Sequence, residues 1–165
     1  MLTISTTVVI ASPPARVWEA VMDLETWPEW HPFVRLRGDL APGEVLAMTF
    51  RKHPRSRVMT TEVRVVEVTP ERRLMFTMGV NKFCWVEQWL QIQPEGEGAL
   101  VVHGVNLRGL LGFAPSQFVA KRVEPVCRLP LEALARHLRP PSRPGAKPVR
   151  RQNRRTRRAA RHRAP

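Results

Sequence analysis

The chain has 165 residues, 43% of them hydrophobic, which is enough for a single domain with a substantial apolar core. The formal net charge of +13 is concentrated at one end, because residues 139–165 contain eleven Lys and Arg and no acidic residue, while the rest holds 16 basic and 14 acidic residues. The charge is therefore no argument that the domain itself binds nucleic acid. No apolar run approaches the roughly 18 residues of a membrane-spanning helix, and the N-terminal stretch lacks the basic region of a signal peptide, so we expect a cytoplasmic protein.

The first part of the chain predicts a strand, a helix and an aromatic turn. Residues 2–11 are rich in Thr, Val and Ile, as strands are. Ser12 is a good N-cap for the helix that we expect over 14–24, where apolar residues recur at helical spacing. Residues 27–33 (WPEWHPF) then combine two Trp and a Phe with two Pro, which favours a compact turn whose rings plug the rim of a sheet.

From Val34 the apolar pattern changes to a period of two, and short turns separate successive strands, which favours an antiparallel meander. A long amphipathic helix is expected over 113–138, interrupted by Pro125 and Pro130, with its apolar face packed on the sheet. Residues 139–165 are too poor in apolar side chains to fold, so we expect a disordered, Arg-rich tail. The expected strands span residues 34–37, 45–51, 58–68, 73–78, 83–93 and 99–107.

Several segments, in order along the chain, resemble those of one protein superfamily. They are PARVWEAV (14–21), Asp23, WPEWHPFV (27–34), Gly43-Glu44, VVEVTPERRL (65–74), LQIQP (90–94) and LRGLLG (107–112). With the order of the elements, they make residues 1–138 similar to the START-like helix-grip (SRPBCC) superfamily, most closely its polyketide cyclase/dehydrase branch. The resemblance implies an α+β fold in which a curved antiparallel sheet of about seven strands wraps round the long C-terminal helix, with one or two short helices after the first strand. Many members carry Asn where this chain has His31, and the basic tail lies outside the pattern.

The resemblance also implies a function. Such proteins typically hold a hydrophobic small molecule, such as a lipid, a quinone or a polyketide, between the sheet and the C-terminal helix. We therefore expect a hydrophobic ligand and no cofactor. The residues expected to contact the ligand lie in the aromatic turn, on the strands and on the long helix, and they are Trp30, His31, Phe33, Met59, Met75, Gln88, Leu90, His103, Val105, Phe118 and Val123.

His103 is the strongest candidate for chemistry. The odd positions of the last strand form its more apolar face, so this imidazole would be a polar group in an apolar pocket, where it orients a ligand carbonyl or acts as a general acid/base. The alternative is a core histidine bonded to a neighbouring strand or to the helix. On the preceding strand Gln88 lies on the same face, and Glu87 on the other. A β-bulge would reverse this register and bring Glu87 beside His103.

Other catalytic signatures are missing from the sequence. Cys84 and Cys127 have neither CxxC nor metal-ligand spacing, and we expect two buried thiols rather than a disulfide. His31, His53 and His103 are too scattered to predict a zinc site, and no nucleophilic triad or phosphate-binding loop is recognisable. These observations weigh against a hydrolase.

Two functions therefore stay open: a carrier or sensor for a hydrophobic molecule, or a cyclase-like enzyme with His103 as acid/base on a poly-β-ketone, assisted by Gln88 or Glu87. The tail either has no function or binds an anionic membrane or nucleic acid by charge attraction and counterion release. Its clustered arginines are Arg150, Arg151, Arg154, Arg155, Arg157 and Arg158.

Overall fold

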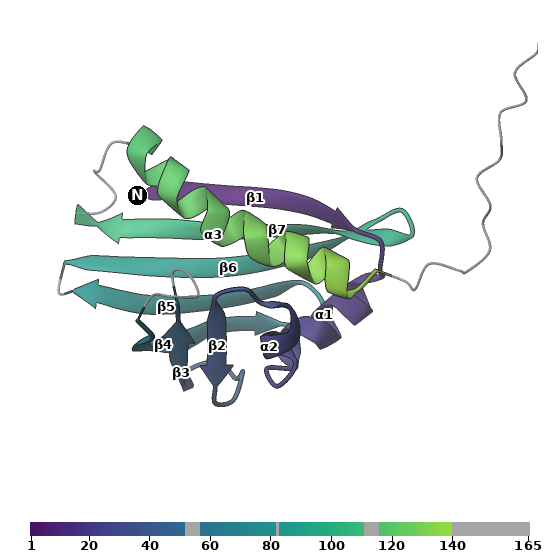
Figure 1. Cartoon of the computed structure of the whole chain (residues 1–165), viewed down its shortest axis with the longest axis horizontal. Helices are drawn as coiled ribbons and strands as arrows, with labels where there is room; N and C mark the ends of the chain where they lie inside the picture. The colour runs from purple at the N-terminus through teal and green to yellow at the C-terminus, as the bar shows by residue number, and fades with distance from the viewer. Residues whose placement is uncertain (52–56, 82, 111–115, 140–165) are drawn as a thin grey trace, which may run out of the picture.

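Ten helices and strands follow one another along the part of the chain that the structure describes. The computed structural model describes residues 1–51, 57–81, 83–110 and 116–139, without the side chains of Val80, Asn81, Ser116 and Phe118. Figure 1 shows the long C-terminal helix lying across one face of a curved sheet. The elements are β1 (Leu2–Ile10), α1 (Pro14–Met22), α2 (Trp27–Trp30), β2 (Val34–Arg37), β3 (Val45–Phe50), β4 (Met59–Thr69), β5 (Arg73–Asn81), β6 (Cys84–Glu95), β7 (Gly98–Gly109) and α3 (Ser116–His137).

The seven strands form one antiparallel sheet in the order β1-β7-β6-β5-β4-β3-β2. Strands β2 to β7 pair in chain order because short turns join them, which confirms the predicted meander. β1 closes the other edge by pairing with β7. The predicted α+β helix-grip fold is thus confirmed. The pairing of β4 with β5 shifts register once, at a bulge between Val65 and Glu67.

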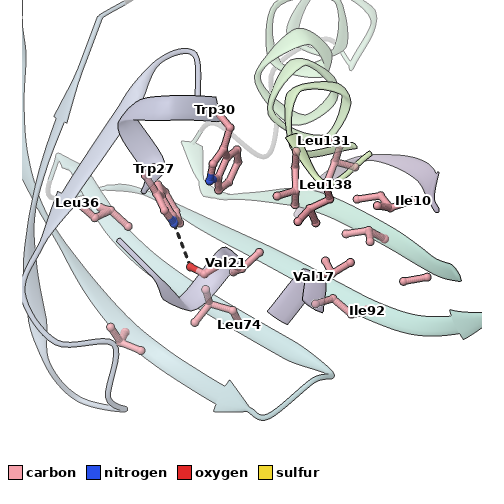
Figure 2. Close-up of a cluster of buried hydrophobic side chains, with 14 of the residues drawn as sticks. Ile10, Val17, Val21, Trp27, Trp30, Leu36, Leu74, Ile92, Leu131 and Leu138 are labelled. Atoms are coloured by element: carbon pink, nitrogen blue, oxygen red, sulfur yellow. Dashed lines mark hydrogen bonds between the residues drawn. The ribbon is translucent and has the colours of Figure 1, made fainter. Parts of the chain in front are cut away.

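The largest group of buried side chains lies between the sheet, α1, α2 and the second half of α3. On α1, Val17 and Val21 are four residues apart and are 0% and 2% exposed, so one face of this helix enters the core. Figure 2 shows Val17 close to Ile92 of the sheet and Val21 close to Leu74, in the same buried cluster as Leu131 of α3. Fully burying side chains of this size stabilises the fold by about 1.5–3 kcal/mol each.

Ser12 does not have the local role that the sequence suggests. The N-cap of α1 is Pro13, with no side-chain capping bond, and Pro14 occupies the first helical turn. The buried Ser12 hydroxyl instead donates to the carbonyl oxygen of Leu138, at 2.9 Å. It therefore provides a donor for a carbonyl group at the C-terminal end of α3. The last carbonyl groups of a helix have no N–H partner within the helix.

The first half of α3 packs on a second, smaller apolar group. Its buried members are Ile4, Val105, Leu107 and Cys127, and Val119, Ala120 and Val123 pack against them. Pro125 and Pro130 both lie inside α3, as predicted. Within residues 1–51, 57–81, 83–110 and 116–139, no helix is both long enough and apolar enough to cross a bilayer. Of the tail that we expect to be disordered, all but Arg139 lies outside the described residues.

Candidate ligand-binding cavity

An apolar cavity of about 80 Å³ lies between the inner face of the sheet and the second half of α3, and the aromatic turn that contains α2 forms part of its wall. Pockets that enclose drug-sized ligands measure roughly 300–1,000 Å³. The cavity as it stands therefore has room for a small ligand or for one end of a larger one.

Hydrogen bonds and ring contacts hold the aromatic turn in place. The indole N–H of Trp27 donates to the carbonyl oxygen of Val21 on α1, at 3.0 Å (Figure 2). The Trp27 ring stacks on His31, with 5.0 Å between centroids and 3° between planes. The Trp30 ring is tilted against both of these rings. Its indole N–H is buried with no hydrogen-bond partner among the described residues, so this part of the cavity wall contains an unused donor.

His31 presents a hydrogen-bond donor. Its Nδ1 accepts from the backbone N–H groups of Phe33, at 3.3 Å, and Val34, at 3.1 Å. Because Nδ1 accepts both bonds, the proton of the neutral ring resides on Nε2. Burial, followed by the neighbouring charges of His103 and Arg35, lowers the pKa of His31 to about 3. At neutral pH the ring is therefore uncharged, with Nε2–H as its one donor.

His103 has the opposite tautomer. It lies on β7, and its Nδ1 is 3.1 Å from the carbonyl oxygen of Cys127 on α3. Since a carbonyl oxygen only accepts, Nδ1 must donate, and Nε2 keeps a lone pair that no described residue uses. Burial lowers the pKa of His103, and the bond to Cys127 opposes this shift only in part. His103 therefore combines the two alternatives that the sequence left open, because it is bonded to the helix and also lines the cavity.

The pairing of β6 with β7 decides which side chains share the cavity face. Leu90 lies opposite His103, so the two side chains are on the same face of the sheet. Glu87 lies on the other face, where it accepts a hydrogen bond from Asn106, at 3.1 Å, and pairs with Arg108, at 2.9 Å. The reversed register that would bring Glu87 beside His103 is therefore not adopted.

The family follows from a comparison with known proteins. The sequence model of the family described as polyketide cyclase/dehydrase and lipid transport matches residues 1–139. The chain belongs to this family. No curated protein matches the chain.

Solved structures agree with this assignment at the level of the fold. A START superfamily protein from Mycobacterium smegmatis is 19% identical, with a TM-score of 0.65 over 82% of this chain and 96% of that one. A protein from Nitrosomonas europaea is 17% identical, with a TM-score of 0.67 over 83% and 94% of the two chains. A protein from Chromobacterium violaceum is 19% identical, with a TM-score of 0.64 over 84% and 98%. At these identities the likeness shows a START-like fold alone.

Not all the residues that the sequence predicts as ligand contacts line the cavity. Six of the eleven line it, and they are Trp30, His31, Phe33, Gln88, Leu90 and His103. Val105 and Val123 belong to the smaller apolar group under the first half of α3 instead. Met59 begins β4 and is 49% exposed. The side chain of Phe118 lies outside the described residues.

Met75 lies on the outer face of the sheet. It pairs with Trp89, and its sulfur accepts a hydrogen bond from Arg73 at 3.9 Å. The reason is the two-residue period of β5, which turns Leu74 and Phe76 towards the cavity and the residue between them away.

Sequence reasoning missed further parts of the cavity wall. Those missed include Val21, Leu36, Val63, Phe76, Pro130 and Leu134. Two signals in the sequence could have found some of them. Phe76 follows from alternation along β5, and Pro130 and Leu134 are four residues apart and so share one face of α3. The contributions of α1 and β2 depend on how the sheet curves, which no local pattern specifies.

The two cysteines are buried free thiols, as expected. Burial, with a smaller effect from Glu124, raises the pKa of the Cys127 thiol to about 12, so this residue is not a nucleophile at neutral pH. In the described part of the chain, no group of three or more His, Cys, Asp or Glu side chains is arranged to hold a metal ion. The chemistry of the cavity therefore centres on its two imidazoles and Gln88.

Proposed function

We propose that this protein binds a hydrophobic small molecule, such as a lipid, a quinone or a polyketide-like compound, and acts as its carrier or sensor. The observation that carries the proposal is the cavity itself, because it is walled mainly by apolar side chains and has few polar groups, chiefly His31, Gln88 and His103. Family membership supports the same class of ligand.

The volume of the cavity restricts how such a ligand binds. An 80 Å³ space does not enclose a whole lipid or quinone, so the head of the ligand occupies the cavity and the remainder extends outwards, or α3 shifts to make room. Val126 lies in the wall and is 40% exposed, so this side of the cavity borders solvent. We expect the ligand to enter there.

Native mass spectrometry of freshly purified protein, followed by organic extraction of any bound mass, tests this function. Leu90→Phe adds bulk at the cavity wall and should remove the retained mass. Val102→Phe is the matched control, because Val102 lies on β7 on the opposite face of the sheet. Retention of the same mass by both variants would place the ligand elsewhere and contradict the proposal.

A cyclase-like enzyme is the second candidate, and the tautomer of His103 favours it. The bond to Cys127 leaves Nε2 of His103 as a free base inside an apolar cavity, which is where a proton acceptor would be needed to enolise a β-ketone. The test is turnover of a poly-β-ketone by His103→Phe and His103→Ala. Unchanged turnover in these variants would exclude His103 as the acid/base.

A further inference from the structure

Four large apolar side chains gather at one end of the sheet, away from the cavity wall. Met1, Leu110 and Phe83 are 75%, 67% and 65% exposed, the highest values among the large apolar residues that the structure describes, and Trp85 is 46% exposed. We call these four residues the apolar tip. In Figure 1 the tip corresponds to the end where β1 and β6 begin and β7 ends.

Backbone pairing brings the four residues of the apolar tip together. The N–H of Leu110 donates to the carbonyl oxygen of Phe83, at 3.1 Å. Trp85 lies opposite Arg108, and a Cβ atom on Gly109 would be 3.3 Å from the Trp85 ring, so this ring covers the end of β7. Met1 precedes Leu2 on β1, and Leu2 pairs with Leu107 near the end of β7.

The charges around the apolar tip are basic. Arg108 lies opposite Trp85, with a side chain that is 52% exposed, and its ion pair with Glu87 leaves these two residues with no net charge. Lys121 and Arg122 are exposed on the part of α3 that packs over β1 at this end. The far end of β6 and β7 has the opposite character, since Glu95 and Glu97 are exposed in their turn.

We propose that the apolar tip docks on an anionic lipid surface. Exposed Phe, Leu and Met side chains beside a Trp are suited to the boundary between head groups and acyl chains, and Arg and Lys at the margin attract anionic head groups. Patches of this kind on a monomer mark an interaction site. The charge polarity of the sheet orients the molecule with the tip towards the bilayer and the acidic turn away from it. The proposal rests on this surface alone and is independent of what the cavity binds.

Fluorescence quenching by acyl-brominated lipids tests the proposal on the full chain, because bromine quenches only tryptophans that enter the bilayer. We expect quenching by phosphatidylcholine vesicles that contain phosphatidylglycerol, weaker quenching by phosphatidylcholine alone, and loss of the quenched component in Trp85→Phe. Phe83→Ser combined with Leu110→Ser should weaken partitioning into the phosphatidylglycerol vesicles about tenfold or more. Val9→Ser combined with Val45→Ser is the matched control, since both residues are exposed apolar strand residues outside the tip, and it should leave partitioning unchanged.

Three results would overturn the proposal. The first is no binding to vesicles of either composition. The second is binding without quenching and without sensitivity to Phe83→Ser and Leu110→Ser, which would mean attachment by the basic tail alone. The third is a tip-dependent dimer in sedimentation analysis whose disruption by the tip variants leaves vesicle binding unchanged, because the surface would then contact a second copy. Quenching is measured on the unaltered chain, so it tests whether the tip enters the bilayer even if a substituted protein does not fold.

Discussion

The hydroxyl of Ser12 donates to the carbonyl oxygen of Leu138 at 2.9 Å, across a sequence separation of 126 residues. This bond joins the junction of β1 and α1 to the C-terminal end of α3, the helix that covers the cavity. It therefore links the two ends of the domain at a buried position, where Ser12 is 4% exposed.

Ser12→Ala should lower the free energy of unfolding by about 1–3 kcal/mol, because the buried Leu138 carbonyl loses its partner. Urea denaturation of the two proteins measures the difference. Ser5→Ala is the control, since Ser5 is exposed on the same N-terminal strand. Equal effects of the two substitutions would mean that the bond does not contribute to stability.

Gly104 should not tolerate a side chain. A Cβ atom there would collide with Cε2 and Cζ2 of Trp89, whose ring lies over this glycine on the outer face of the sheet. We expect Gly104→Ala to destabilise the fold by about 1–3 kcal/mol. Adding Trp89→Leu should recover part of that loss, which a double-mutant cycle detects. Gly79→Ala has open space around the new Cβ atom, so it should be nearly neutral in the same assay.

The stability should fall as the solution is acidified through the range of histidine titration. His31 has a pKa of about 3 in the fold, against roughly 6.5 in the unfolded chain. Between about pH 6.5 and pH 3 this histidine is protonated in the unfolded chain but not in the folded chain, so acid favours unfolding. This effect removes roughly 2 kcal/mol between about pH 8 and pH 5. His31→Asn, which keeps an acceptor for the backbone of Phe33 and Val34, should have a shallower pH profile. An identical profile would show that His31 is not the origin.

The tautomers of the two cavity histidines predict selectivity for a neutral ligand with a hydroxyl group. Phenol can donate to Nε2 of His103, whereas its methyl ether anisole cannot. A hydrogen bond of about 0.5–1.5 kcal/mol corresponds to a preference of roughly twofold to tenfold for phenol. Tryptophan fluorescence titration measures both affinities, and His103→Phe should abolish the preference. A preference for anisole in the unaltered protein would contradict the assigned tautomer.

Removing residues 140–165 should change binding to anions without changing the fold. Leu138 is the last core residue that the structure describes, at 8% exposure, so we expect the free energy of unfolding to stay within about 0.5 kcal/mol. We expect the eleven basic residues after Leu138 to give the full chain a salt-dependent affinity for RNA or anionic vesicles. Only Arg139 stays after truncation. Salt-dependent RNA binding of equal strength in the truncated chain would exclude the tail as its source.

Local patterns were sufficient for most of the elements and for the pairing of β2 to β7, but not for the pairing of β1 with β7. The period of two after Val34 and the short turns that follow specify antiparallel neighbours, since a short turn cannot join parallel strands. Alternation also placed Gln88, Leu90 and His103 on one face, because side chains on a strand must point to opposite sides in turn. The same rule, applied to β5, would have placed Phe76 rather than Met75 at the cavity.

The sequence by itself determined the α+β helix-grip fold, the family and the apolar face that a ligand would meet. Only the tertiary structure decided what the polar groups do. Ser12 has the propensity of an N-cap, yet its partner is the end of α3, which only chain packing brings near. The tautomer of His103 depends on the Cys127 carbonyl of α3, and the pKa of His31 depends on burial and on His103, which is distant in sequence. Hydrogen bonds and desolvation act through space, so residue spacing along the chain does not encode them.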